Sequence, residues 1–329
     1  MRYSTLVLLL TFFNSNAQQM EGLDPSFGLG GVVRPMFTVP EVCRSVVVQP
    51  DGKILVSGTV GMDAAMDIFV WRLLADGSFD PNWGVNGRVV TNVAGFKDET
   101  RKMILQPDGK VLVSSLSRSA SSGLGYLRVI RYLPNGAMDP DFGTSGIAIT
   151  SQYIIRLPDM ALQPDGKILI GGGDNTIKFL RLMPDGTLDT TFGVNGVLSS
   201  TGQLTGNSVD VGAMIVVRPD GKIVMGVPEE VNDIRVDQYT SSGVLDTDFG
   251  NMGSSVFSFP SNWGATKMKD MIIDTDDNIL LAAESSYDPP RSTHPQAFKD
   301  LPSPLERGKG GEASPGCRCH PWRGFLFCG

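Results

Sequence analysis

The chain is poor in the residues on which many enzymes and nucleic-acid-binding proteins depend. Its 329 residues include only two histidines and four cysteines, and the formal net charge is −7. A surface of this sign does not neutralise phosphates, so we expect no nucleic-acid partner. No apolar run approaches the length of about 18 residues that a membrane-spanning helix requires. Nothing in the sequence indicates a cofactor either.

Glycine and proline, by contrast, are abundant. The chain has 39 glycines and 21 prolines, and only 19% of its residues are charged. Such a composition favours many short strands joined by tight turns over a helical protein. With 41% hydrophobic residues the chain has enough apolar side chains for a sizeable core. We therefore expect an all-β fold.

The N-terminus has the three parts of a secretory signal. Arg2 supplies the positive start, residues 6–13 form an apolar run, and Ser15-Asn16-Ala17 resembles a cleavage site. The alternative is a short N-terminal strand or anchor. We predict that residues 1–17 are a signal peptide and that the mature protein is secreted or lies at the cell surface.

Two motifs recur along the chain with a period of about 56 residues, which is the strongest signal in the sequence. The hairpin motif, of the form QPDGKILVSG, occupies residues 46–58, 103–115, 160–172 and 214–226, and in decayed form 271–283. The aromatic motif, of the form LDxxFGxxG, occupies residues 23–31, 79–87, 138–146, 188–196 and 245–253. Because both keep the same register five times, we predict a repeat array over residues 22–284.

Each repeat reads as four strands. In the second full unit we expect strands over residues 87–93, 103–106, 111–115 and 127–133. Pro107-Asp108-Gly109 joins the second to the third, since proline presets φ, aspartate bonds its own backbone and glycine accepts positive φ.

These strands are apolar on both faces, as continuous runs such as Met103-Ile104-Leu105 show. A strand with one face in water would alternate with polar residues, so both faces must be covered by neighbouring sheets. Four short strands per unit between neighbours predict a β-propeller of four-stranded antiparallel blades. A less regular β-solenoid or stacked array is the alternative.

The two motifs together resemble the delta-60 repeat, a β-propeller family of large bacterial surface and secreted proteins. Residues 49–58 followed by 73–87 carry the resemblance, which extends over about residues 22–284. Trp83 replaces the usual phenylalanine, and Thr275 and Asp277 replace proline and glycine in the fifth unit. The resemblance implies a propeller fold and an extracytoplasmic location, but no defined activity, catalytic residue or cofactor.

The pattern stops after Ala283. Residues 285–329 contain both histidines, three of the four cysteines and neither repeat motif. We interpret them as an unrelated tail produced by a shifted reading frame; a genuine disordered or cysteine-bearing tail is the alternative. On this interpretation the array is truncated. Five units are too few for a seven-bladed ring, although a tight five-bladed ring remains open.

The repeated aspartates invite a calcium or acid–base interpretation. Since each occurs once per unit beside a turn, we expect them to be structural. Asp76 with Asp80, and Asp185 with Asp189, fall short of the oxygen ligands of a calcium loop. The two series are Asp51, Asp108, Asp165 and Asp220 in the hairpin motif, and Asp24, Asp80, Asp139, Asp189 and Asp246 in the aromatic motif.

Other candidates are weaker. Cys317, Cys319, His320 and Cys328 contain zinc-type ligands but with tighter spacing than usual, and Cys43 is expected to be a small core residue. Gly171-Gly172-Gly173 ends a strand, so it is no phosphate cradle. The recurring aromatic residues are expected in the core between blades: Phe27, Trp83, Phe142, Phe192 and Phe249. The non-repeating acids lie in sequences rich in other polar residues, so we expect them in loops on a solvated face: Asp98, Glu99, Glu229, Glu230 and Asp233.

Two functions remain open. The first is a non-catalytic binding or structural module whose loops at one end hold an unidentified protein or glycan. The second is a propeller-fold hydrolase or lyase with a site in the central funnel, whose two carboxylates would come from the non-repeating acids. An enzyme should gather these acids at one place on the ring, whereas a scaffold should scatter them. We predict no catalytic, cofactor-binding or metal-binding residue.

Overall fold

The computed structural model describes most of the repeat array. The described residues are 23–33, 39–62, 66–93, 96–119, 125–153, 159–173, 176–203, 213–228, 233–258, 266–285 and 325–327. The predicted signal peptide lies outside them, as does nearly all of the predicted tail, so both stay predictions. Within these ranges the chain forms strands and turns and no helix, and hence no helix long and apolar enough to cross a membrane.

The strands form five sheets, called blades 1 to 5. Blade 1 consists of β1 (Glu41–Val48), β2 (Ile54–Val60), β3 (Asp67–Leu73) and β4 (Arg88–Thr91). Blade 2 consists of β5 (Phe96–Leu105), β6 (Val111–Ser119), β7 (Gly125–Tyr132) and β8 (Ile147–Tyr153). Blade 3 consists of β9 (Asp159–Leu162), β10 (Ile168–Gly173), β11 (Thr176–Leu182) and β12 (Val197–Gln203). Blade 4 consists of β13 (Met214–Val217), β14 (Ile223–Pro228), β15 (Asp233–Tyr239) and β16 (Ser254–Ser258).

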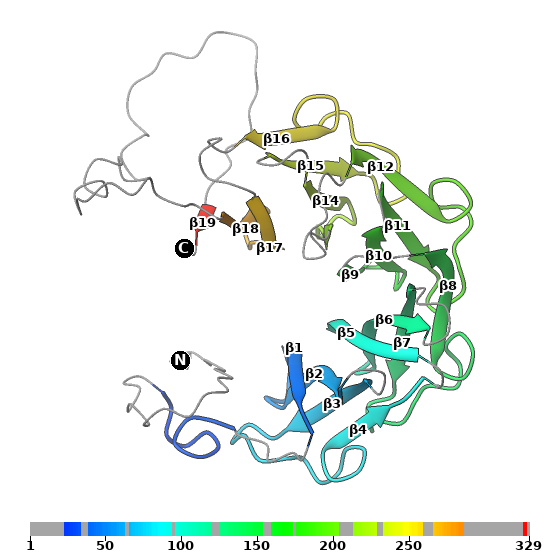
Figure 1. Cartoon of the computed structure of the whole chain (residues 1–329). Helices are drawn as coiled ribbons and strands as arrows, with labels where there is room; N and C mark the ends of the chain where they lie inside the picture. Colours follow the sequence, from blue (N-terminus) through cyan, green and yellow to red (C-terminus); the bar gives the residue numbers. More distant parts are fainter. Residues whose placement is uncertain are drawn as a thin grey trace, which may run out of the picture.

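Each of these four blades is an antiparallel sheet in simple sequence order. The blades follow one another along an open arc, with β1, β5, β9 and β17 toward its inside and β4, β8, β12 and β16 at its rim (Figure 1). This arrangement confirms the predicted all-β propeller fold of four-stranded blades. The blades do not meet across the opening of the arc.

The structure corrects the phase of the repeat. The sequence grouped residues 87–93 with the strands that follow them, but β4 pairs with β3 and closes blade 1. The chain then crosses to the inside of the arc to begin blade 2 with β5, which starts at Phe96 rather than at Met103. Each sequence repeat therefore contains the last strand of one blade and the first three of the next.

This topology gives every blade two unlike ends. The hairpin motif joins the first two strands of a blade. A second glycine turn, followed by the aromatic motif, joins the third and fourth strands. Both connections lie at the same end of the blade, here called the turn end. The connections between the second and third strands, and between successive blades, lie at the opposite end, here called the loop end. The loop-end connections differ in length, from residues 174–175 between β10 and β11 to residues 204–213 between β12 and β13.

The core lies between the blades, as the strands with two apolar faces predicted. Leu55 and Val70 of blade 1 pack against Val113 and Ile130 of blade 2. Equivalent clusters join blades 2 and 3, blades 3 and 4, and blades 4 and 5. Three of the recurring aromatic residues belong to these interblade clusters and are buried, which confirms their expected role: Trp83, Phe142 and Phe192.

Blade 5 differs from the others. It contains β17 (Thr266–Ile273), β18 (Ile279–Ser285) and β19 (Phe325–Phe327). The first two strands pair antiparallel, as in every blade, but β19 pairs parallel to β18. Part of the sequence after the repeat array thus lies beside β18, where blades 1 to 4 place their third strand.

Candidate functional site

The hairpin-motif aspartates lie at exposed turns. In blade 2 the Asp108 carboxylate accepts a hydrogen bond from the backbone N of Lys110 at 3.1 Å, and Gly109 has a φ of 84°. The same side-chain-to-backbone bond forms in three further blades, from the backbone N of Lys53, Lys167 and Lys222 to the carboxylates of Asp51, Asp165 and Asp220. These carboxylates fix the turn that brings two strands of one blade together.

Four of the five aromatic-motif aspartates are buried instead: Asp80, Asp139, Asp189 and Asp246. In blade 2, Asp139 Oδ2 lies 2.8 Å from Arg131 Nε on the third strand and 3.1 Å from the Nζ of Lys110 in the hairpin motif. Its other oxygen accepts a bond from the Asp141 backbone N at 3.1 Å. The two motifs that recur in register are therefore in direct contact, which gives a physical reason for their common period.

The same arginine reaches the next blade. Arg131 Nη1 donates to the carbonyl oxygen of Pro184, in the turn that follows the third strand of blade 3. Arg72 donates in the same way to the carbonyl oxygen of Pro134, at 2.9 Å. Each buried guanidinium thus ties the carboxylate of its own repeat to the backbone of its neighbour.

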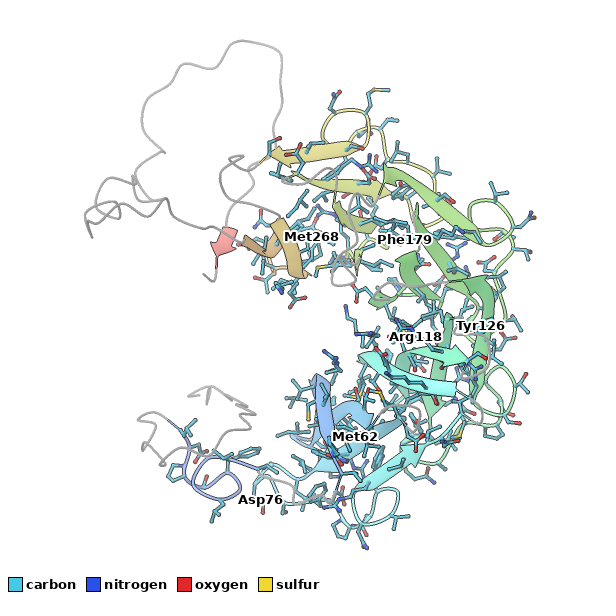
Figure 2. The ribbon with its side chains drawn as sticks, in the orientation of Figure 1. Met62, Asp76, Arg118, Tyr126, Phe179 and Met268 are labelled. Carbon is cyan, nitrogen blue, oxygen red and sulfur yellow. The ribbon has the colours of Figure 1, made fainter. Side chains whose placement is uncertain are left out.

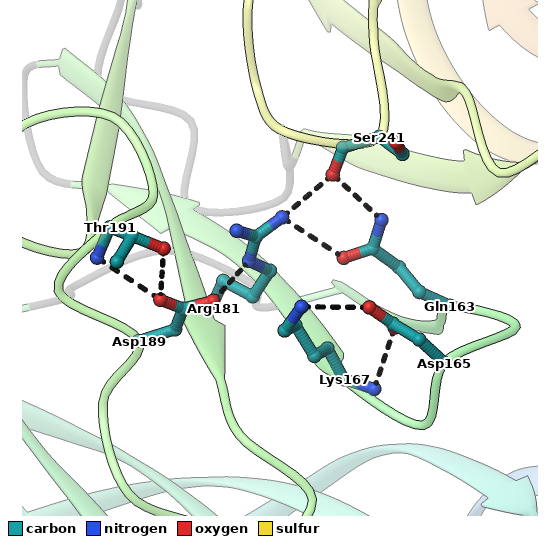
Figure 3. A network of polar contacts seen from close by, with 7 residues as sticks. All are labelled: Gln163, Asp165, Lys167, Arg181, Asp189, Thr191 and Ser241. Carbon is teal, nitrogen blue, oxygen red and sulfur yellow. Dashed lines mark hydrogen bonds and ion pairs between the residues drawn. The ribbon is translucent and has the colours of Figure 1, made fainter.

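Blade 3 shows the network most completely (Figure 3). Arg181 Nε donates to Asp189 Oδ2 at 2.8 Å, and Nη1 donates to the Ser241 carbonyl oxygen of blade 4 at 2.7 Å. Gln163, the residue before the hairpin turn, donates to that same carbonyl oxygen at 3.1 Å. Thr191 donates to the second oxygen of Asp189 from its backbone N and its hydroxyl.

Blade 4 exchanges the arginine and the glutamine. Arg218 stands at the position of Gln163, and Gln238 at the position of Arg181. Gln238 Nε2 donates to Asp246 Oδ2 at 2.8 Å, while Arg218 Nε donates to Gln238 Oε1 at 2.8 Å. Arg218 also reaches blade 5, donating to the Asp277 carbonyl oxygen at 2.8 Å. Blade 4 therefore has the same three groups as blade 3, namely one arginine, one glutamine and one aspartate. The arginine and the glutamine have exchanged positions along the chain.

These contacts set the charge of the aspartates. Burial pushes the pKa of Asp139 upward, but the bond from Lys110, the backbone N of Asp141 and the charge of Arg131 together hold it below its usual range. The Arg131 guanidinium also lies 4.3 Å from the centroid of the Phe142 ring. On its other side that ring contacts Gly186 of blade 3, where an added Cβ would come within 2.9 Å of a ring atom.

Sequence reasoning missed the arginine of this network, although a signal was present. An arginine precedes the aspartate of the aromatic motif by eight residues in three repeats, at Arg72, Arg131 and Arg181. The repeated carboxylates are occupied by turns and by contacts between blades.

The expectation of a solvated loop position is wrong for Asp98, which lies on a strand at the loop end. Asp98 on β5 is fully buried and accepts bonds from the Val93 backbone N, at 3.0 Å, and from the Ser117 hydroxyl. Its own backbone N donates to the carbonyl oxygen of Met66 in blade 1. Burial raises the pKa of this carboxyl, although Ser117 and Val93 oppose the shift. Asp98 therefore joins blade 1 to blade 2 and is closed to solvent.

Glu99 points the other way, since neighbouring residues of a strand face opposite sides of the sheet. Its two carboxylate oxygens bind two guanidiniums: Oε2 lies 2.5 Å from Arg101 Nη2, and Oε1 lies 2.6 Å from Arg118 Nη1. Arg118 is about one-third exposed and is labelled on blade 2 in Figure 2. The Glu99–Arg101–Arg118 cluster thus combines one carboxylate with two guanidiniums, and Arg118 is its most exposed member.

Further polar groups of blades 1 and 2 contact each other at the loop end. The backbone N of Thr100 donates to the hydroxyl of Thr59, and its own hydroxyl donates to the carbonyl oxygen of Gly58. The hydroxyls of Ser57 and Ser115 are buried, and neither has a hydrogen-bond partner among the described residues.

Of the remaining candidates that the structure describes, Asp233 does not join this cluster. Asp233 begins β15 in blade 4, two blades away from Asp98 and Glu99. Glu229, Glu230 and the zinc-type set Cys317, Cys319, His320 and Cys328 lie outside the described residues. Within the described ranges, no three His, Cys, Asp or Glu side chains are grouped as metal ligands. Gly171-Gly172-Gly173 ends β10 and leads into β11, as expected.

Blade 1 holds two further titratable groups at the start of β1. Burial raises the pKa of Glu41 to about 7, despite the opposing charge of Arg88. Cys43 is a half-buried free thiol packed beside the core of blade 1, and burial together with the charge of Glu41 raises its pKa to about 11. A thiol with so high a pKa is a poor nucleophile at neutral pH. Nothing in the local sequence pattern singled out Glu41.

A family model described as "Domain of unknown function (DUF5122) beta-propeller" matches residues 49–82, 106–142 and 163–192. Each matched segment begins at the glutamine before a hairpin turn and includes the arginine and aspartate of the turn-end network. The match supports a β-propeller family. It describes a fold and carries no activity, and the delta-60 name remains an expectation from the sequence. No curated protein matches the chain in sequence.

Several solved structures are similar to this chain over about three quarters of its length. A GH43 endo-arabinanase from Bacillus licheniformis is 14% identical, with 71% of this chain and 95% of that chain covered and a TM-score of 0.41. A protein of unknown function from Dyadobacter fermentans is 11% identical over 74% of both chains, with a TM-score of 0.46. The PQQ-bound aldose sugar dehydrogenase of Streptomyces coelicolor is 12% identical over 75% and 72%, with a TM-score of 0.42. At these values the likeness carries no argument about activity.

Proposed function

We propose that the chain is an exported, non-catalytic β-propeller that binds a glycan or protein ligand through its loop end. The observation that carries the proposal is the Glu99–Arg101–Arg118 cluster. It offers a carboxylate acceptor and guanidinium donors at a partly exposed place, held on rigid strands. Such groups recognise sugar hydroxyls and polar peptide groups. The neighbouring Asp98 is closed to solvent, so no second carboxylate faces Glu99 from β5.

The unlike ends of the blades support the same proposal. At the turn end the recurring charged groups hold one blade to the next. At the loop end the connections differ in length and sequence from blade to blade, which is where rigid scaffolds commonly carry binding residues. Export is supported by the signal-like residues 1–17; N-terminal sequencing of the protein secreted by a bacterial host should begin at Gln18.

Affinity electrophoresis in gels containing neutral or acidic polysaccharides tests the ligand, while reducing ends and unsaturated ends are measured in the same samples. We expect retention by at least one polysaccharide without product release, and loss of retention in Glu99→Gln and Arg118→Gln. Asp141→Asn at the turn end is the matched control and should be retained like the parent chain. Retention unchanged in both loop-end variants would overturn the assignment of the cluster.

A propeller-fold hydrolase or lyase is the second candidate, and one observation favours it. Glu41 has a pKa near 7, and one of its carboxylate oxygens is buried without a partner among the described residues. A carboxyl of this kind is suited to proton transfer at neutral pH. Product release that disappears in Glu41→Gln, with retention unchanged, would establish this activity in place of simple binding.

A further inference from the structure

The face of blade 1 that points away from blade 2 is uncovered at its inner strand. Val46 of β1 pairs with Val56 of β2, and it is 46% exposed. The residue at the same register position of the next four blades is at most 3% exposed, because the preceding blade covers it; these residues are Met103, Met160, Ile215 and Met271. Val48 on the same face is 56% exposed. The exposed apolar face therefore has the shape of an interblade junction with one partner missing.

Residues 23–33 already form the outer part of that missing partner. The backbone N of Gly28 donates to the Asp76 carbonyl oxygen at 2.7 Å, in the turn after the third strand of blade 1. Gly84 donates to Asn135 of blade 2 in the same way, and Gly143 to Asp185 of blade 3. Figure 2 shows Asp76 where the N-terminal segment meets blade 1. The segment thus occupies the place of the aromatic motif of a blade that precedes blade 1.

The partners of this aromatic motif are incomplete. In four repeats its aspartate is buried and bound by an arginine or a glutamine of the third strand, at Asp80, Asp139, Asp189 and Asp246. Asp24, at the same position, is exposed, and its carboxylate accepts hydrogen bonds from the backbone N and the hydroxyl of Ser26. Phe27 is buried against the core of blade 1, at the position where Phe142 lies beneath Arg131.

We propose that the uncovered face of blade 1 is the docking surface for one further blade of the same repeat, to which residues 23–33 contribute the aromatic motif. The third strand of that blade carries an arginine that pairs with Asp24, lies over the Phe27 ring and donates to the carbonyl oxygen of Ala75. Ala75 stands at the position of Pro134 and Pro184, the acceptors in blades 2 and 3. The occupant is a repeat unit because the contacts already present continue an established interface.

The experiment supplies such a blade. A copy of residues 96–137, which contains β5, β6 and β7 of blade 2 with Arg131, is inserted between Gly22 and Leu23 of the full chain, so that it runs directly into the N-terminal aromatic motif. Asp24→Asn should leave the Tm of the parent chain unchanged and lower that of the inserted chain by roughly 5–10 °C, because only there is Asp24 paired. Asp139→Asn is the matched control and should lower Tm in both chains.

Cysteine labelling measures independently whether the inserted blade covers the exposed face of blade 1. With Val46→Cys, peptide-resolved maleimide labelling should be fast in the parent chain and at least about tenfold slower in the inserted chain, as for a site moved into an interblade core. Val194→Cys, which is 76% exposed at a turn-end tip, should label equally in both. The copied Arg131→Ala in the insert should remove the effect of Asp24→Asn.

Three results would overturn the proposal. The first is equal labelling of the Val46→Cys thiol in parent and inserted chains. The second is the same response to Asp24→Asn in both. The third is a dimer of the parent chain, seen by light scattering, in which the Val46→Cys thiol is protected, because a second copy would then be the occupant. A second insert, residues 159–187 from blade 3, repeats the test; failure of both inserted chains to fold, where the parent folds, also counts against it.

Discussion

The two ends of the blades use charge in opposite ways. At the turn end, the same carboxylate, cation and carbonyl oxygen recur from blade to blade, and the side chains of the ion pair are buried, as for Arg131 and Asp139. At the loop end, Asp98 and the Glu99 cluster belong to blade 2, and Glu99 and its arginines remain partly exposed. Repeated charges therefore hold the blades together, whereas we propose that the Glu99 cluster, which breaks the repeat, binds the ligand.

Of the changes that test this difference between the two ends, removal of a buried turn-end aspartate should lower the unfolding free energy most. Asp139→Ala leaves Arg131 and Lys110 without their carboxylate, and Arg131 is buried. Removing one partner of a buried ion pair costs about 3–5 kcal/mol of unfolding free energy. Asp141→Ala, two residues away and exposed, should cost less than about 0.5 kcal/mol. Urea unfolding of both variants measures the difference, and equal losses would contradict a structural role for Asp139.

Acid should destabilise the fold mainly by protonating the buried aspartates of the turn end. The pKa values of Asp80, Asp139, Asp189 and Asp246 lie below the usual value in the folded chain. Such groups stabilise the fold above the unfolded-state pKa, and this stability is lost as the pH falls through the folded-state values, hence below about pH 4. Asp98 has the opposite sign, because its raised pKa favours the protonated form in the folded chain.

These opposite effects can be measured from a curve of unfolding free energy against pH between pH 7 and pH 2. Asp139→Asn should flatten the curve below about pH 4, and Asp98→Asn should leave that part of the curve in place. A curve whose acid limb is unchanged by Asp139→Asn would show that the turn-end carboxylates do not carry the pH dependence.

The glycine of the hairpin motif should show an intermediate effect. Gly109 has a φ of 84°, where a β-branched side chain is strained. Gly109→Val should therefore cost about 1–3 kcal/mol in unfolding free energy. Its Cβ would meet Pro134 at an ordinary contact distance, so backbone strain rather than a clash accounts for the loss. Loss of ligand binding with unchanged stability would instead place this turn in the binding site.

The exchange seen in blade 4 provides a test of the network itself. Arg181→Gln should destabilise blade 3, and adding Gln163→Arg should restore part of the loss by recreating the arrangement of Arg218 and Gln238. Coupling between contacting residues of this kind is typically about 0.5–3 kcal/mol. A double-mutant cycle by chemical unfolding gives this value. Additive losses would mean that the two positions act separately.

The smallest effect is expected at the loop end. Glu99→Gln removes the charge from a partly exposed cluster, so the unfolding free energy should change by less than about 1 kcal/mol. Ligand retention, by contrast, should be lost. A loss of stability as large as that of Asp139→Ala would show that Glu99 belongs to the scaffold, and the two ends would no longer differ in the way described.

The sequence by itself determined the all-β fold, the number of repeats and the turn chemistry. Positive φ at Gly109 and burial of Phe142 follow from local pattern, because a turn and a two-faced strand impose their requirements on neighbouring residues. The phase of the blades did not follow, since pairing of β4 with β3 rather than β5 depends on the crossover between sheets.

Tertiary structure alone decided which charges meet. Asp98 and Glu99 are neighbours in sequence, but strand alternation buries one between blades and exposes the other to two arginines. Arg131 meets the Pro184 carbonyl oxygen across 53 residues, and this contact exists only once two blades are packed. Local sequence specifies the conformation of a turn, whereas the burial, pairing and pKa of a charged group depend on the neighbour that folding brings to it.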